Sequence, residues 1–200
     1  MKTKRAEYWE IVNCLHEHNI NPLTREIYLG GWPTTSEDEE VGVDHQMACE
    51  FIRNISFLEG QSDEPILVHQ CTVGGEWSYG MAIYNAIHES NCYVTVRAYA
   101  HARSMSSIII QAADLRQLMP DCYFMIHHGS IFIDDTCKGG KSYMELSDKD
   151  SIRMMEVYCE RAHMTPKQIE DKLDKKQEWY LPAYEAVELG FADEVYERSE

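Results

Sequence analysis

Basic residues are scarce in this sequence, which has 18 Lys and Arg against 34 Asp and Glu in 200 residues and a formal net charge of −16. Nucleic-acid binding needs clustered Lys and Arg side chains that neutralise phosphates, so this composition argues against a nucleic-acid partner. The sequence also lacks an apolar run that approaches the length of a membrane span. No apolar segment follows the basic first residues, as one would in a secretory signal. We therefore expect a soluble protein with neither a nucleic-acid nor a membrane partner.

Cysteine pairs of the C-x-x-C type are also missing, although the sequence contains seven cysteines. Without such pairs the sequence gives no signal of a zinc site, and we expect neither a metal nor a cofactor. The odd number and wide scatter of the cysteines argue against a disulfide framework, and most of them lie in apolar runs, where a free cysteine packs as a small hydrophobe. This usage is typical of a reducing compartment and predicts a cytoplasmic location.

Strand-like and helix-like segments alternate along most of the chain. Apolar periodicity predicts helices over residues 6–18, 43–60, 78–90, 104–115, 147–163, 165–176 and 182–190. Short apolar or β-branched runs predict strands within residues 21–31, 64–71, 92–100 and 122–127. Such alternation indicates parallel β-α units in one α/β domain. We expect an N-terminal helical segment over residues 1–23 and a single α/β domain over residues 24–200.

Three polar features follow predicted strands and are candidates for chemistry. Ser104 stands between a strand and a helix, where the amide of Met105 would point at an oxyanion formed on attack by the serine. Gly74 and Gly75 follow the preceding strand, and glycine lets a backbone amide approach a substrate closely. His127 ends the next strand. Because the carboxyl ends of parallel strands share one edge of a sheet, these residues could converge there.

Each of these signals also fits an ordinary structural role. A serine at a helix start is commonly a cap, a histidine at a strand end is commonly a hydrogen-bonded structural residue, and Gly-Gly is commonly a turn. The third group that a nucleophilic triad needs could be Glu178, in "QEWYLPAYEAV", but a glutamate in an acidic chain is commonly a solvated charge. The sequence lacks G-x-S-x-G, so an α/β-hydrolase is not indicated. The residues alone leave a serine hydrolase as one option among several.

Five segments together resemble the ClpP family, the proteolytic subunits of Clp proteases. In chain order they are "TREIYLGG", "VGGEWSYGMAIYNAI", "AHARSMSS", "LMPDCYFMIHHGS" and "EWYLPAYEAVELGFADEV". Their order and spacing match the family from about residue 24 to residue 195. The resemblance implies an α/β fold of stacked β-α units, of the ClpP/crotonase type, with a protruding strand-helix handle over about residues 130–163.

The resemblance implies a role for each matched residue. Ser104 aligns with the nucleophile and His127 with the general base, while Gly75 and Met105 align with the donors of the oxyanion-hole amides and Gly74 lies beside them. The family's third residue is an aspartate, and the aligned position here carries Glu178. Asp174, four residues earlier, is the alternative. Arg103 replaces a small residue of the family beside the nucleophile.

The resemblance also implies an assembly and partners. It indicates a serine endopeptidase that cleaves peptides or unfolded proteins inside a homo-oligomer of two stacked heptameric rings, with an AAA+ unfoldase ATPase as a possible partner. The N-terminal segment lacks the family's axial-loop sequence and reads as a helix, and the acidic stretch "GWPTTSEDEEVGV" looks like an insertion. Two alternatives remain open, a catalytically silent ring subunit and a crotonase-like enzyme acting on acyl-CoA.

Overall fold

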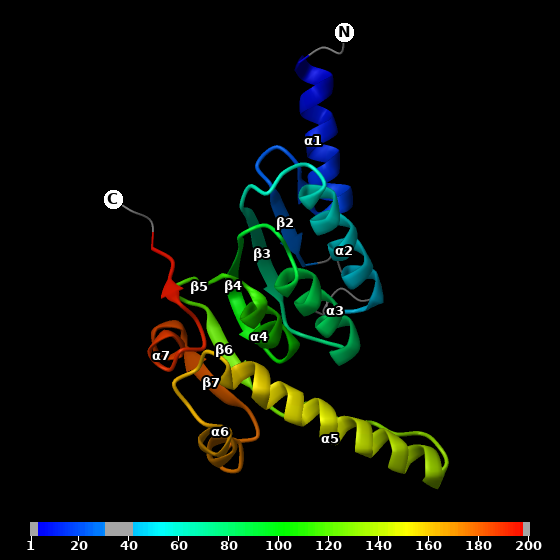
Figure 1. Ribbon diagram of the computed structural model, residues 1–200, viewed down its shortest axis with the longest axis vertical. Helices are drawn as coiled ribbons and strands as arrows, with labels where there is room; N and C mark the ends of the chain where they lie inside the picture. Colours follow the sequence, from blue (N-terminus) through cyan, green and yellow to red (C-terminus); the bar gives the residue numbers. More distant parts are fainter. Residues whose placement is uncertain (1–3, 31–41, 198–200) are drawn as a thin grey trace.

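The computed structural model describes residues 4–30 and 42–197 (Figure 1), so most of the acidic stretch expected to be an insertion lies outside the described residues. The elements follow one another as α1 (Lys4–His18), β1 (Ile20–Asn21), β2 (Glu26–Leu29), α2 (His45–Glu59), β3 (Ile66–Thr72), α3 (Trp77–His88), β4 (Val94–Arg103), α4 (Met105–Ile109), the 3-10 helix η1 (Ile110–Ala112), β5 (Leu115–Leu118), β6 (Tyr123–Ile126), α5 (Cys137–Cys159), α6 (Pro166–Leu173), β7 (Trp179–Pro182), α7 (Ala183–Glu188) and β8 (Glu194–Val195).

The strands form one mixed sheet whose centre is parallel. Its main path runs β1-β2-β3-β4-β5-β8, and every pair from β2 to β8 along this path is parallel. The long strand β4 pairs first with β5 and then, over its last three residues, with β6. Strand β7 is antiparallel to β6. The parallel centre with helices packed on it confirms the predicted α/β class and the stacked β-α units.

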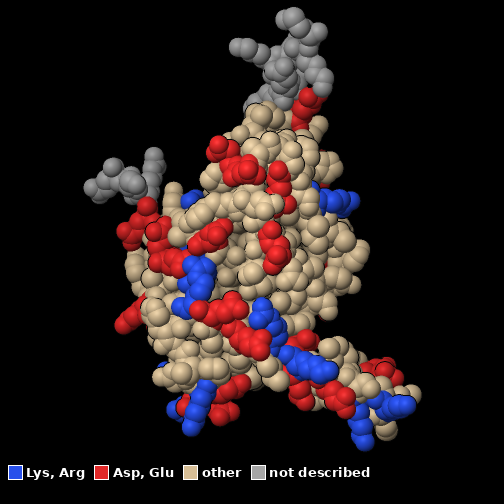
Figure 2. Space-filling model, viewed as in Figure 1, with Lys and Arg blue, Asp and Glu red and all other residues tan. Residues whose placement is uncertain are grey.

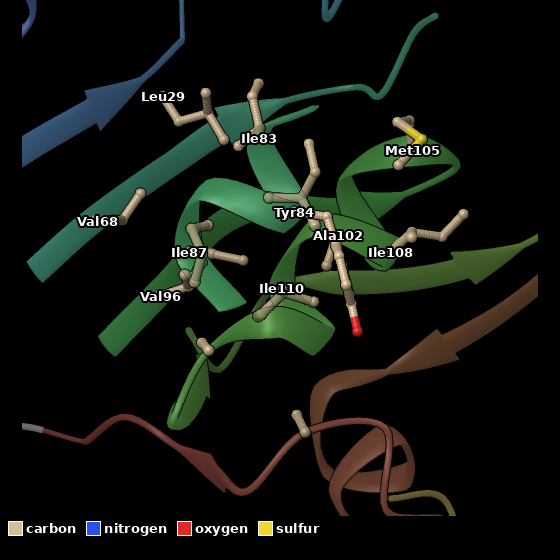
Figure 3. Close-up of a cluster of buried hydrophobic side chains, with 14 of the residues drawn as sticks. Leu29, Val68, Ile83, Tyr84, Ile87, Val96, Ala102, Met105, Ile108 and Ile110 are labelled. Carbon is tan, nitrogen blue, oxygen red and sulfur yellow. The ribbon is translucent and has the colours of Figure 1, made fainter. Parts of the chain in front are cut away.

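The core lies between the parallel strands and the helices α2, α3 and α4 (Figure 1). Figure 3 shows its labelled side chains, which come from the strands and from the covering helices: Leu29, Val68, Val96 and Ala102 from strands, and Ile83, Tyr84, Ile87, Met105, Ile108 and Ile110 from helices. Ile66, Val68, Val94 and Val96 fill the buried positions at the starts of β3 and β4, because branched side chains pack well on a pleated surface that is covered. This packing fixes the helix starts that follow β3 and β4, where the candidate site lies.

Several helices begin and end where the sequence predicts. In α2, the predicted apolar face is buried, and Asp44 caps the helix by accepting a hydrogen bond from the amide of Met47 at 2.8 Å. In α6, Thr165 is the predicted N-cap, and it forms a capping box with Gln168. Both devices satisfy amides that a helix start leaves unpaired, which is why short polar residues mark these boundaries in the sequence.

Two helix predictions are wrong in extent. The helix expected over residues 104–115 is shorter than predicted: it consists of α4 followed by η1, and strand β5 begins at Leu115. Strand β5 carries Arg116, which is 2% exposed and paired with Asp193 at 2.7 Å, so its sequence does not read as apolar. The helix expected over residues 147–163 begins ten residues earlier, at Cys137, where Thr136 caps it.

Helices α1 and α5 project from opposite ends of the molecule (Figure 1). Most of α5 before Met154 is exposed, whereas Met154, Met155, Val157 and Tyr158 are buried at its base. Along α5 and over the rest of the viewed face, Asp and Glu side chains are widespread, with Lys and Arg beside them on the helix (Figure 2). None of the helices in the described ranges is both long enough and apolar enough to cross a membrane.

Candidate active site

Ser104 occupies a sharp turn between β4 and α4. Its backbone angles are φ 53° and ψ −132°, and a non-glycine residue at positive φ is strained by about 1–3 kcal/mol. The turn is held from both sides: the Ser104 amide donates to the carbonyl of Met125 at 3.1 Å, and the Ser107 hydroxyl lies 2.7 Å from the Ser104 carbonyl oxygen. The strained turn presents the Ser104 hydroxyl at the end of β4.

The hydroxyls of the two neighbouring serines are hydrogen-bonded inside the protein. Ser106 and Ser107 are both fully buried. The Ser106 hydroxyl donates to the Arg103 carbonyl at 2.7 Å, and Ser107 Oγ lies 2.6 Å from the hydroxyl of Tyr158. Neither hydroxyl is accessible to a substrate, so Ser104 is the residue of this segment that is placed to react.

His127 lies directly after β6 and faces Ser104. Its Nε2 is 2.8 Å from Ser104 Oγ, within reach of a proton transfer. The two residues meet because β6 runs parallel to the end of β4, in the register that pairs Arg103 with Met125. Burial lowers the pKa of His127 below its ordinary value, while the charge of Glu178 raises it and His128 lowers it further. The imidazole is therefore neutral at neutral pH and free to accept a proton.

Glu178 lies directly before β7, and His127 lies directly after β6. Strands β6 and β7 are antiparallel, and their last pair is Ile126 with Trp179, so the two residues leave the sheet at the same end. The Glu178 carboxylate acts on His127 through its charge, and no hydrogen bond joins the two side chains in the described part of the chain.

Tyr180, which the sequence did not single out, is hydrogen-bonded to Glu178. The hydroxyl of Tyr180 donates to Glu178 Oε2 at 3.0 Å, and this bond raises the pKa of Tyr180. Arg103 also interacts with Tyr180 and lowers that pKa. Asp174 lies elsewhere, at the C-cap of α6, and its charge is not among those that shift the pKa of His127. Of the two carboxylates considered for the third role, the structure brings Glu178 to the histidine.

The glycine pair follows β3 and lies beside the Ser104 turn. A side chain on Gly74 would place its Cβ 2.7 Å from Ser104 Cβ and 2.8 Å from the Met105 amide nitrogen, so only glycine fits. Gly74 and Gly75 have φ values of 103° and 146°, which favour glycine. Gly75 forms a parallel bridge with Val43. The amides of Gly75 and Met105 donate to no other group in the described ranges, so both remain available to a bound oxyanion.

A cleft of about 460 Å³ opens beside the Ser104–His127 pair. Its walls come from the starts of α3 and α4, from the segment after β6, and from one side of α5. A larger cavity of about 630 Å³ lies between α1 and the strands β2, β3 and β4 and includes neither of the two residues. Within the residues that the structure describes, no three His, Cys, Asp or Glu side chains are placed to hold a metal ion.

Comparison with known proteins identifies a family for the chain that carries this site. A family model described as Clp protease matches residues 39–199. The similar proteins include ATP-dependent Clp protease proteolytic subunit 2 of Pseudomonas aeruginosa, which is 28% identical over 160 residues that cover 77% of each chain. They also include an ATP-dependent Clp protease proteolytic subunit of Deinococcus radiodurans, 25% identical over 162 residues that cover 78% of each chain. The matched region contains the whole candidate site.

Proposed function

Because the chain belongs to the Clp protease family, we propose that it is a serine-type peptidase in which Ser104 is the nucleophile. Ser104 attacks the carbonyl of a peptide bond while His127 takes the hydroxyl proton at Nε2 and then gives it to the leaving amine. Water, activated by the same imidazole, hydrolyses the acyl-enzyme. The single observation that carries this proposal is the 2.8 Å contact between Ser104 Oγ and His127 Nε2 at a strained, tightly held turn.

The oxyanion of the tetrahedral intermediate would bind the amides of Gly75 and Met105. Preorganised amides stabilise charge that develops in the transition state without reorganising. Met105 is the first residue of helix α4, and its side chain is buried against α3. The contact with Gly80 of α3 is so close that a Cβ on Gly80 would lie 2.0 Å from Met105 Cγ. Packing against Gly80 therefore holds the Met105 side chain, and with it the backbone that carries the amide.

Labelling with a fluorophosphonate tests the proposed nucleophile. The reagent phosphonylates a serine only where a base and an oxyanion hole activate it. We expect one modification per chain, and peptide mapping should place it on Ser104. A catalytically silent ring subunit or an acyl-CoA enzyme of related fold would remain unlabelled, so an unmodified chain that is folded and assembled would overturn the proposal.

The pH dependence of peptide hydrolysis should follow His127, which has to be neutral to accept a proton. Burial lowers its pKa from the ordinary 6.5, so the neutral form persists to a lower pH than for an exposed histidine. We expect kcat/KM for an uncharged peptide to rise along one acidic limb with a midpoint below pH 6.5 and to be level at neutral pH. A pH–rate profile, with assembly checked by light scattering at each pH, measures this; a midpoint above pH 6.5 would contradict the role of His127.

The exposed apolar side chains on and near α5 support the proposal that copies of the chain assemble. Phe132, before the helix, is 91% exposed, and Leu146 and Ile152 on the helix are 52% and 61% exposed. Large apolar side chains left exposed on a projecting segment are typical of contact with another protein chain. We propose that this handle, about residues 130–163, joins copies of the chain into stacked heptameric rings. The names of the relatives, subunits of an ATP-dependent protease, support an AAA+ ATPase as the partner that delivers unfolded protein.

Light scattering should find a mass many times that of the 23.2 kDa subunit under conditions in which the protein is active. Phe132→Asp would place a charge in the proposed contact, so we expect it to shift the population toward smaller species. Leu23→Asp is the matched control, because it places the same charge on a 73% exposed apolar side chain outside the handle, and it should leave the mass unchanged. An active monomer would rule out the proposed assembly.

A further inference from the structure

One wall of the cleft is a stripe along α5. The stripe residues recur at intervals of three or four and include Tyr143, Leu146, Ser147, Asp150 and Met154. Residues spaced in this way lie on one side of a helix. The start of α3, with Glu76 and Trp77, also lines the cleft, as do Gly75 and Ser104. The side chain next to the attacked carbonyl would therefore lie between the start of α3 and the stripe on α5.

Asp150 lies within the stripe as a carboxylate without a compensating cation. The indole N–H of Trp77 donates to it, and burial raises its pKa. Asp193 shows the contrasting case. Burial alone would raise the pKa of Asp193, but the guanidinium groups of Arg116 and Arg161, at 2.7 and 2.8 Å, lower it. Asp150 thus has a hydrogen-bond donor that fixes its orientation, and it lacks a positive partner within the described residues.

The other charged groups of the cleft do not supply that partner. Glu76 is a second carboxylate, at the N-cap of α3, and it makes no capping hydrogen bond. His128 is turned to Glu170, whose carboxylate lies 3.0 Å from His128 Nε2. No Lys or Arg of the described ranges lines the cleft. The charged side chains that line the cleft, histidines aside, are therefore both carboxylates, and Trp77, Tyr143 and Leu146 add apolar surface beside them.

We infer that Asp150 determines specificity, and that the cleft receives a Lys or Arg side chain from the residue whose carbonyl Ser104 attacks. The inference rests on the proposed peptidase function. The carboxylate of Asp150 binds the cationic head through a charge-assisted hydrogen bond, and Trp77 and Tyr143 pack along the aliphatic stem. Long basic side chains suit such a site because they bury their methylene groups while the charge pairs at the end.

A pair of peptides tests the inference on the wild-type assembly. The peptides are identical except that one carries arginine and the other citrulline, its uncharged analogue of the same shape, before the scissile bond. We expect kcat/KM to be about tenfold or more higher for the arginine peptide, the size of effect that a partly buried charge pair gives. Equal values, or a faster reaction of the citrulline peptide, would overturn the inference.

Asp150→Asn tests the residue. Asparagine keeps the size of the side chain and an oxygen that accepts from Trp77, but it removes the charge. The ratio of kcat/KM between the arginine and citrulline peptides should fall close to one. Asp148→Asn removes the same charge from an exposed position of α5 outside the cleft, so it should keep the wild-type ratio. An unchanged ratio in Asp150→Asn, or an equal fall in Asp148→Asn, would overturn the assignment to Asp150.

Fluorophosphonate labelling distinguishes a failure of the specificity inference from a failure of the proposed peptidase function. If Ser104 is labelled and the arginine peptide has no advantage in the wild type, the specificity inference fails while the peptidase function stands. If neither peptide is cleaved and Ser104 is unlabelled, the proposed function fails and the inference fails with it. A faster phosphonylation of wild-type Ser104 by an arginine-bearing phosphonate than by its citrulline analogue would support the inference without relying on a variant that must fold.

Discussion

Replacing Ser104 with alanine should reduce peptide hydrolysis by roughly 10³- to 10⁶-fold. The alanine removes the oxygen that attacks the carbonyl, and neither Ser106 nor Ser107 can replace it because both hydroxyls are buried and hydrogen-bonded. The strained turn should persist, since alanine has no greater difficulty at φ 53° than serine. The measurement is the initial rate on a fluorogenic peptide, together with the melting temperature and the assembled mass.

The control for this change is Ser142→Ala. Ser142 is an exposed residue of α5 outside the cleft, and its hydroxyl donates to the Lys138 carbonyl. This variant should keep wild-type activity and stability. Turnover near the wild-type rate in Ser104→Ala would contradict the nucleophile assignment. Loss of activity with loss of assembly in the same variant would instead mean that the turn, not the oxygen, had been removed, so the assembled mass decides which explanation holds.

The parts of the fold that the sequence predicted are those fixed by local rules. The apolar face of α2 and the capping box at Thr165 follow from spacing and from the need to pair free amides. The alternation of helices and strands predicted the parallel sheet, and the five motifs predicted the family that the comparison confirms. Each helix cap or apolar face depends on a few consecutive residues, and the alternation and the motifs depend on their order along the chain.

The parts that were missed depend on contacts between distant segments. Strand β5 is stabilised around Arg116, whose partner Asp193 comes 77 residues later, so its sequence resembles the end of a helix. Strand β7 is only four residues long, and it exists because β6 offers an antiparallel edge. Periodicity could reveal neither pairing, because it reports one segment at a time.

The sequence indicated only part of the geometry of the candidate site. Ser104 and His127 could be selected because both follow strands that end at the same edge of a parallel sheet. Tyr180 and Asp150 were not selected, since their importance depends on which side chains they meet across β7 and α5. A signal existed for Tyr180: it lies two residues from Glu178, and residues two apart on a strand share a face.

Glu178 takes the place of an aspartate by the resemblance of its segment to the family, and we propose that it orients His127; Glu178→Gln should then slow the chemical step by roughly 10²- to 10⁴-fold. A neutral imidazole that accepts at Nε2 carries its proton on Nδ1, and the charge of Glu178 acts on this imidazole. Its carboxylate would hold this tautomer and stabilise the imidazolium that forms on attack. Glutamine keeps the size but removes the charge, so kcat should fall far more than binding weakens.

The pH profile distinguishes this role from a purely structural one. The charge of Glu178 raises the pKa of His127 against the larger effect of burial. Removing the charge therefore lowers that pKa, and the acidic limb of kcat/KM should move to lower pH in Glu178→Gln. Asp174→Asn is the control, because that carboxylate does not act on His127; it should change neither the rate nor the limb. A full-rate Glu178→Gln, or an unmoved limb, would exclude Glu178 as the positioning residue.

The shorter carboxylate of Glu178→Asp tests whether the backbone is adapted to glutamate. Tyr180 donates to Glu178 Oε2 at 3.0 Å and so helps to hold the longer carboxylate in place. Aspartate would end one methylene nearer its own backbone, where it would lose this bond, so we expect activity to fall although the charge remains. Tyr180→Phe should lower kcat in the same direction but less, because it frees the carboxylate without removing it. Activity above wild type in Glu178→Asp would mean that this strand retains the geometry of an aspartate, and that glutamate is the poorer partner for His127.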